Sequence, residues 1–223
     1  MAIKLLSDQT IGKIAAGEVI ERPVSIVKEL LENAVDSGAT RIAVEIRNGG
    51  SGEIRVVDDG CGIPAAEMAL AVQRHATSKL SEFSDLERVR TLGFRGEALA
   101  SIAAVSRIQI RSSEPNVPVG TTLVSQFGSS PEISPGPPVG GTTVTVNDLF
   151  ANVPARLKFL KQPSTESTAI QRVVAAYAAS RADLSIRLTI DERTVFSTDG
   201  TARWLLPWTW FTAARWERIG KTF

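Results

Sequence analysis

The chain has 223 residues, of which 43% are hydrophobic and 22% charged, an ordinary composition for one sizeable globular domain or two small ones. Its formal net charge of +1 indicates no particular class of partner. The one cysteine, Cys61, excludes an intrachain disulfide and fits a reducing compartment. The sequence starts without a signal-peptide pattern, and the apolar run at residues 204–214 is shorter than the ~20 residues of a membrane span. We therefore expect a cytoplasmic protein with no membrane partner.

The charge is distributed unevenly along the chain. Residues 1–150 hold 14 basic and 18 acidic residues, a net charge of −4, whereas residues 151–223 hold 11 basic and 6 acidic residues, a net charge of +5. The second part therefore suits a weak contact with a polyanion. An ordinary solvated face is the alternative explanation.

Hydrophobic periodicity and turn residues predict the elements of the first half. A helix is expected from Pro23 to about Asp36, because proline suits a first helical turn and Gly38 suits a helix end. Alternating apolar residues then predict a hairpin of strands at 41–47 and 53–57. The elements expected next are helices at 65–76 and 97–105 and a strand at 107–111.

The second half begins with residues 112–141, which are rich in Pro, Gly and Ser and are expected to hold one short strand, at 121–127, between loops. A strand at 142–146, a helix at 164–181 and a strand at 184–190 are expected to follow. Because the strands are joined by hairpins while the helices gather separately, we predict an α/β (α+β) fold. It is a two-layer sandwich of helices on a mixed, largely antiparallel sheet.

The first helix carries a polar stripe beside its apolar face. Glu29, Asn33 and Asp36 stand at i, i+4 and i+7, whereas Lys28 and Glu32 are expected to face water. An exposed polar stripe would explain the pattern. An amide, however, gives Mg²⁺ an oxygen ligand without adding charge near phosphates, and a carboxylate one turn away can take a proton from water.

Three further segments suit the parts of a nucleotide. Asp58 ends a strand and can accept a hydrogen bond from an exocyclic amine, while Gly60 and Gly62 allow backbone to approach a flat base. A tight acidic turn would have the same sequence. Residues 92–99 are expected to form a glycine loop that opens a helix, where backbone N–H groups bind anions, and residues 77–79 supply two hydroxyls and a cation.

These motifs occur together in one known family. The motifs are Glu29-x-x-x-Asn33, Asp58-x-Gly60-x-Gly62, Gly93-Phe94-Arg95-Gly96-Glu97-Ala98-Leu99 and Gly141-Thr142-Thr143. Their order and spacing resemble the N-terminal ATPase region of the MutL family of DNA mismatch repair proteins. The chain is thereby also similar to the wider GHKL-type ATPases: gyrase B, a heat-shock chaperone and the sensor histidine kinases. The segments 14–23, 74–79 and 152–156 resemble MutL in particular.

The resemblance implies an ATPase that uses ATP and Mg²⁺. Glu29 would be the general base, Asn33 would ligate Mg²⁺, and Asp58 would hold the adenine amine. Gly60, Gly62 and Thr143 would line the base pocket. The lid and the triphosphate loop would be formed by Thr77, Ser78, Lys79, Gly93, Arg95, Gly96, Ala98 and Leu99.

The resemblance also implies an organisation and partners. Residues 1–200 would form the ATP-binding domain, and residues 201–223, which hold all four tryptophans, form an atypical tail. The family's second subdomain supplies a lysine to the γ-phosphate. Because the sequence stops at Phe223, we expect impaired hydrolysis and dimer switching. A nucleotide-binding fragment without turnover and a kinase-type domain are therefore alternatives. The implied partners are DNA bound through its phosphates, a mismatch-recognition protein, a downstream nuclease or helicase, and a second copy of the chain.

Overall fold

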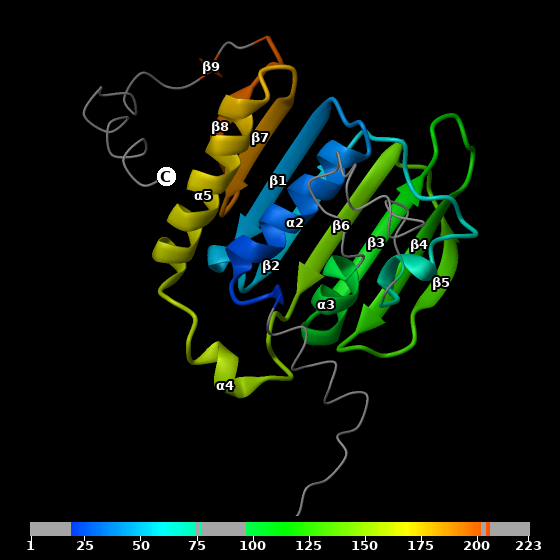
Figure 1. The fold of residues 1–223 in the computed structure, drawn as a ribbon, viewed down its shortest axis with the longest axis horizontal. Helices are drawn as coiled ribbons and strands as arrows, with labels where there is room; N and C mark the ends of the chain where they lie inside the picture. The colour runs from blue at the N-terminus through cyan, green and yellow to red at the C-terminus, as the bar shows by residue number, and fades with distance from the viewer. Residues whose placement is uncertain (1–18, 75, 77–96, 202–203, 206–223) are drawn as a thin grey trace, which may run out of the picture.

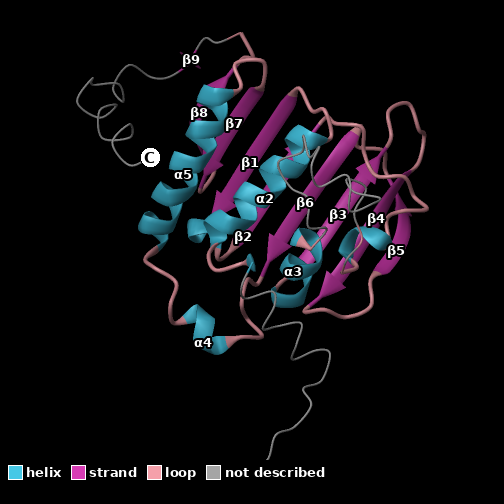
Figure 2. Ribbon diagram, viewed as in Figure 1, coloured by secondary structure: helices cyan, strands magenta, loops and turns pink. Residues whose placement is uncertain are grey.

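The computed structural model describes residues 19–74, 76, 97–201 and, for the backbone alone, 204–205. Helices cover one face of a single twisted sheet (Figures 1 and 2), as the sequence predicted. The helices are α2 (Pro23–Asp36), α3 (Ala98–Val105), α4 (Pro154–Leu157) and α5 (Pro163–Ser180), with 3₁₀ turns η1 (Asn48–Gly50) and η2 (Leu70–Val72).

The strands are β1 (Arg41–Arg47), β2 (Glu53–Asp58), β3 (Arg107–Ser113), β4 (Gly120–Gln126), β5 (Glu132–Gly136), β6 (Gly141–Asn147), β7 (Ser185–Ile190), β8 (Arg193–Thr198) and β9 (Trp204–Leu205). Within the described ranges their order is β5-β4-β3-β6-β2-β1-β7-β8-β9. β1 and β7 are parallel, and every other neighbouring pair is antiparallel.

The core lies between this sheet and the helices. Strand β1 buries Ile42, Val44 and Ile46 and turns its other side chains outward, which is the alternation expected of a sheet with one covered face. Helix α2 packs its apolar stripe on the sheet, and α5 lies beside α2 (Figure 1). Among the helices of the described ranges, none is both long and apolar enough to cross a bilayer.

The helix expected at 65–76 is wrong. Residues 65–69 form turns and Leu70–Val72 a 3₁₀ helix, because most backbone N–H groups here bond three residues back, as Glu67 N–H does to the Pro64 carbonyl at 2.9 Å. Met68 is fully buried, whereas the residues around it are partly or fully exposed. One anchored side chain is too little packing to stabilise a longer helix.

Glu32 is also not where the sequence suggested. Its side chain is only 7% exposed, because α5 packs against the face of α2 that the hydrophobic periodicity predicted to be exposed to water. The Tyr177 hydroxyl of α5 donates a hydrogen bond to Glu32 Oε1 at 2.8 Å, and the Lys28 ammonium lies 3.7 Å from the same atom. Burial and the neighbouring carboxylate of Glu32 raise the pKa of Tyr177, so it stays a donor at all physiological pH values.

We expect Tyr177→Phe to lower the free energy of unfolding by about 1 kcal/mol, because it leaves a buried carboxylate without its neutral donor. Lys28→Ala, which removes an exposed partner of the same carboxylate, should cost less than about 0.5 kcal/mol. Urea unfolding at neutral pH compares the two variants. Equal losses would contradict the assignment of Tyr177 as the main partner of Glu32.

Candidate functional site

At one end of the sheet, the helix-covered face changes from apolar to polar side chains. Asp58 of β2 pairs with Thr142 of β6, which pairs with Ser112 of β3, and directly paired residues point to the same face. Two residues along each strand, the corresponding row is Val56, Val144 and Ile110, all buried in the core. We call Asp58, Thr142 and Ser112 the polar row. It lies on the same face of the sheet as the hydrophobic core and directly next to it.

Asp58 is held between β2, β6 and the end of α2. Burial raises the pKa of its carboxyl group to about 6, against the opposing effect of hydrogen bonds from the backbone N–H groups of Gly60 and Thr142 and from Ser37. The Gly60 N–H lies 2.9 Å from Asp58 Oδ1. At neutral pH this carboxylate is a partly buried acceptor, which favours a ligand that brings a hydrogen-bond donor.

The adjacent acid, Asp59, has a different role. Its carboxylate accepts hydrogen bonds from the backbone N–H groups of Thr40 and Arg41, both at 2.7 Å, and from the Thr40 hydroxyl and the Arg41 guanidinium. Burial opposes ionisation, but these bonds outweigh it and lower the pKa of Asp59 to about 2. Asp59 therefore joins the end of β2 to the start of β1. Both of its carboxylate oxygens are already used by these four hydrogen bonds and are not available to a ligand.

Gly60 and Gly62 are required by the packing of the turn itself. A Cβ on Gly60 would collide with Ser37 Oγ, and one on Gly62, which has φ +74°, would collide with the Ser113 carbonyl oxygen. Hydrogen bonds also hold the turn on both sides. The Cys61 N–H donates to the Ser37 carbonyl at 3.0 Å, and the Ile63 N–H donates to the Ser112 hydroxyl at 2.8 Å. The packing of the protein alone therefore explains why glycine stands at these two positions, without a bound base.

Helix α2 carries the polar stripe toward the same end of the sheet. Glu29, Asn33 and Asp36 are partly exposed, and each interacts with other groups of the protein. Ser37, directly after the helix, lies beside the turn that follows Asp58, because its carbonyl accepts a hydrogen bond from the Cys61 N–H at 3.0 Å. Glu29 lies eight residues before Ser37, or about 12 Å along the helix axis. A base bound at Asp58 and phosphates bound near Glu29 would thus lie at two different places along α2, about 12 Å apart along its axis.

Ala98 and Leu99 form the first turn of α3, which packs near α2. Leu99 packs against the core, and Ala98 is partly exposed. The other predicted lid and loop residues lie outside the described residues; they are Thr77, Ser78, Lys79, Gly93, Arg95 and Gly96.

Thr143 does not share the face of Asp58. It pairs with Val57 in β2, so its side chain points to the opposite face of the sheet, where it is 5% exposed. Thr142 is the threonine that lies beside Asp58. The alternation of Val144 and Val146, both buried in the core, could have revealed this from the sequence, because Thr142 has the same parity. Ser112 is not predictable in the same way, because it begins the stretch of residues 112–141, whose Pro, Gly and Ser content favours loops.

Helix α2 offers few oxygen ligands for a metal ion. Among the described residues there is no group of three or more His, Cys, Asp or Glu side chains that could hold an ion. One amide oxygen, from Asn33, with the Glu29 carboxylate a turn away nevertheless suits Mg²⁺, which binds proteins through one or two oxygens and takes its other ligands from phosphates and water.

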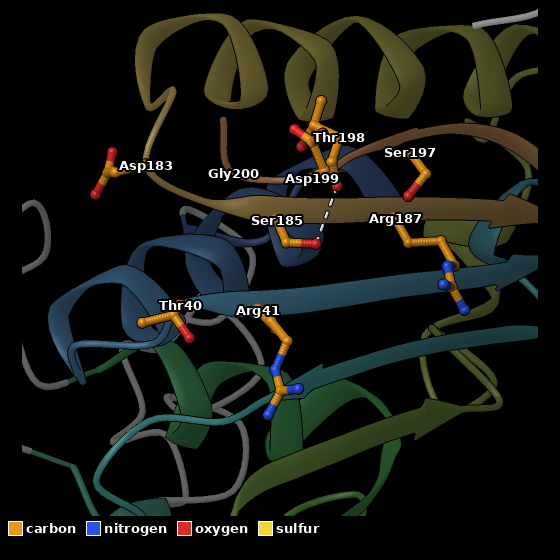
Figure 3. Close-up of a pocket in the computed structure, with 9 residues that line it drawn as sticks. All are labelled: Thr40, Arg41, Asp183, Ser185, Arg187, Ser197, Thr198, Asp199 and Gly200. Carbon is orange, nitrogen blue, oxygen red and sulfur yellow. Dashed lines mark hydrogen bonds between the residues drawn. The ribbon is translucent and has the colours of Figure 1, made fainter. Parts of the chain in front are cut away.

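A separate cavity of about 440 Å³ opens at β1, β7 and β8 (Figure 3). Its lining includes Arg41, Ser185 and Arg187. These side chains alternate with the buried residues of β1 and β7, so they lie on the face of the sheet that carries no helix. The Ser185 hydroxyl donates to the Thr198 carbonyl at 2.9 Å, the dashed line in Figure 3. No predicted site residue lines this cavity, so it is distinct from the polar row.

Residues 18–149 match the family of histidine kinase-, DNA gyrase B- and HSP90-like ATPases. This match covers more than half of the chain, so the chain belongs to that ATPase family. Within the family it is similar to MutL, and the resemblance to the N-terminal ATPase region of MutL is confirmed.

Two MutL proteins illustrate the similarity. The "DNA mismatch repair protein MutL" of Desulforudis audaxviator is 49% identical over 201 residues, covering 89% of this chain and 35% of that protein. MutL of Bradyrhizobium diazoefficiens is 50% identical over 193 residues, covering 86% of this chain and 32% of that protein. The chain thus spans about a third of the length of these relatives.

The fold agrees with solved structures. The Aquifex aeolicus MutL ATPase domain, complexed with ADP, aligns with a TM-score of 0.65 and 32% identity over 82% of this chain and 65% of that one. The N-terminal domain of a DNA repair protein aligns with a TM-score of 0.70 and 26% identity over 86% of this chain and 56% of that one.

Proposed function

We propose that this chain is the ATP-binding and ATP-hydrolysing switch region of a MutL-type DNA mismatch repair protein. The observation that carries the proposal is the polar row beside the end of α2, in a chain about half identical to MutL proteins. The ADP complex of the Aquifex aeolicus domain supports a nucleotide as the ligand.

At the base end, the Asp58 carboxylate would accept a hydrogen bond from the exocyclic amine of adenine. Its partly desolvated position makes that bond stronger than one in water, because less solvent competes for the acceptor. Thr142 would contact the same edge of the base, in place of Thr143. Gly60 and Gly62 would keep the turn narrow enough for the base to lie against it.

At the phosphate end, Glu29 would take a proton from the attacking water, and Asn33 would hold Mg²⁺. Bound Mg²⁺ would neutralise charge on the phosphates. A general base of this kind contributes about 10²–10⁴ in rate. Asp36, three residues beyond Asn33, would accept a hydrogen bond from the Asn33 NH₂ group and so orient the Asn33 oxygen toward Mg²⁺. We further propose that the triphosphate lies at Gly93, Arg95, Gly96, Ala98 and Leu99, under a lid that holds Thr77, Ser78 and Lys79.

For the longer protein, we propose that residues 1–200 act as the ATP-binding domain, and that the tail of residues 201–223 begins where its sheet ends, at the edge strand β9. ATP would pair two copies, which would contact DNA through its phosphates and signal to a mismatch-recognition protein and a nuclease or helicase. The exposed Lys158 and Lys161 support a phosphate contact, since neither forms an ion pair with any residue in the described ranges.

The proposal is tested by Mg²⁺-dependent phosphate release from ATP, with nucleotide binding measured on the same sample. Binding with turnover supports the full proposal. Binding without turnover leaves a nucleotide-binding region that needs groups from outside this chain, and a stable phosphoprotein would favour the kinase-type alternative. Absence of binding would contradict the proposal.

A further inference from the structure

Two polar contacts join α5 to α2, one toward each end of the buried stripe of α5. At the start of α5, Arg22 donates to the buried Glu166 through two nitrogens, at 2.9 and 3.3 Å. Toward the end of α5, the Tyr177 hydroxyl donates to Glu32 Oε1 at 2.8 Å. The buried side chains between these two contacts are apolar. Since Glu32 directly precedes Asn33, only the second contact lies beside the proposed phosphate end.

Glu32 belongs to a group of three carboxylates on α2. Glu29, Glu32 and Asp36 stand at i, i+3 and i+7, within about 60° of each other around the helix. Glu29 and Asp36 are partly exposed, whereas Glu32 is buried against α5. Burial and the Glu32 carboxylate raise the pKa of Tyr177, and the charges of Glu29 and Asp36 raise it further. All three acids are therefore near enough to act electrostatically on the Tyr177 hydroxyl.

The number of free carboxylates at this place matters for a nucleotide, because phosphates repel them. Asn33 offers Mg²⁺ an oxygen without adding charge, but Glu32 next to it would add a full negative charge if its side chain turned away from α5. The Tyr177 hydroxyl and the Lys28 ammonium, 3.7 Å from the same oxygen, hold Glu32 on the α5 side. Because the hydroxyl is neutral, it fixes Glu32 without adding a cation that could also pair with Glu29.

We propose that Tyr177 is a positioning residue that keeps the Glu32 carboxylate away from the nucleotide phosphates. By holding Glu32 against α5, it lowers the negative charge that faces the phosphate end, where Glu29 and Asn33 would act. Tyr177 acts through Glu32 and not on the nucleotide itself. This inference rests on the proposed function, because it requires phosphates beside α2.

The affinity for ATP with Mg²⁺, measured by calorimetric titration, tests the inference. Tyr177→Phe removes the hydroxyl alone and should lower the affinity about fivefold, the effect of one like charge near the phosphates at the effective dielectric constant of a protein surface. Adding Glu32→Gln to Tyr177→Phe should restore the affinity to within about twofold of the parent, because the released side chain then carries no charge.

The matched control is Glu166→Gln, which weakens the other polar contact between α2 and α5 and releases no carboxylate beside Asn33. It should leave the affinity for ATP within about twofold of the parent. An equal loss in Glu166→Gln and Tyr177→Phe, a loss that Glu32→Gln does not restore, or an unchanged affinity in Tyr177→Phe would overturn the inference while leaving the proposed function intact. A parent chain that binds no ATP would overturn both.

The salt dependence of binding is a second readout. Because the loss in Tyr177→Phe comes from charge repulsion, raising NaCl from about 0.05 M to about 0.5 M should reduce the difference from the parent to less than about twofold. A role of Tyr177 in packing alone predicts the same loss at both salt concentrations, and that result would contradict the inference.

Discussion

Replacing Asp58 by asparagine is expected to stabilise the fold at pH 7.5 and to weaken ATP binding at least tenfold. Asp58 has a pKa of about 6 in the folded chain against 3.8 as its ordinary value, because it is buried. The folded state therefore binds its proton more tightly, and the stability from this group is present below pH 4 and lost as the pH rises through 6. Asparagine removes that loss, a gain on the order of 2 kcal/mol.

The neighbouring Asp59 is the matched control, because its shift has the opposite sign. With a pKa of about 2, it contributes stability above pH 4 that is lost as the pH falls toward 2. Asp59→Asn should therefore destabilise the fold at pH 7.5, by about 1 kcal/mol once solvent screening is allowed for. Urea unfolding between pH 4 and 7.5 measures both variants. The same sign for both, or an ATP affinity that Asp58→Asn leaves unchanged, would contradict the roles given to the two acids.

Glu29→Ala is expected to lower the rate of ATP turnover by at least about 100-fold and to change ATP affinity less than about threefold. The reason is that a general base acts on the water in the transition state and contributes little to ground-state binding. Steady-state phosphate release and equilibrium binding, measured together, separate the two effects.

Glu45→Ala is the control for Glu29, since Glu45 is a carboxylate on the outer face of β1 that pairs with Arg55 at 2.9 Å. It should keep turnover within about twofold of the parent. A Glu29→Ala chain that turns over ATP as the parent does would place the base elsewhere.

The segment from α2 to β2 was predictable because local signals agreed with packing. α2 begins at Pro23 and ends at Asp36, and Gly38 beyond it has φ +75°, as the proline and glycine indicated. The hairpin of β1 and β2 followed from strict alternation. The placement of Glu32 could not be predicted from one helix, because it depends on α5, more than 130 residues away, covering α2.

Strands β5 and β8 were missed for two different reasons. β5 contains Pro135 and is almost fully exposed, which is tolerated only because it is an edge strand. β8 follows β7 through Asp191 and Glu192, which have φ +47° and +66°. This hairpin conformation is normally marked by Asn-Gly or Asp-Gly, so the usual turn signal was absent.

For the site, the sequence pattern predicted candidate residues but did not indicate which way each side chain points. Asp58 lies at the end of β2 beside α2, and its neighbour Asp59 is fixed to β1 instead. The sequence pattern treats the two acids alike, and only the three-dimensional contacts separate them. Thr142 could have been chosen over Thr143 by strand parity, whereas the connection of Ser112 to Ile63 spans 49 residues and has no local signal.

The central claim is that a nucleotide base binds over the polar row. Titration of the chain with ATP and Mg²⁺, followed through backbone amide chemical shifts, tests it residue by residue. We expect saturable shifts at Gly60, Gly62 and Thr142, and none at Ser185 or Arg187 in the separate cavity. Shifts confined to the cavity, or none at all, would contradict the account.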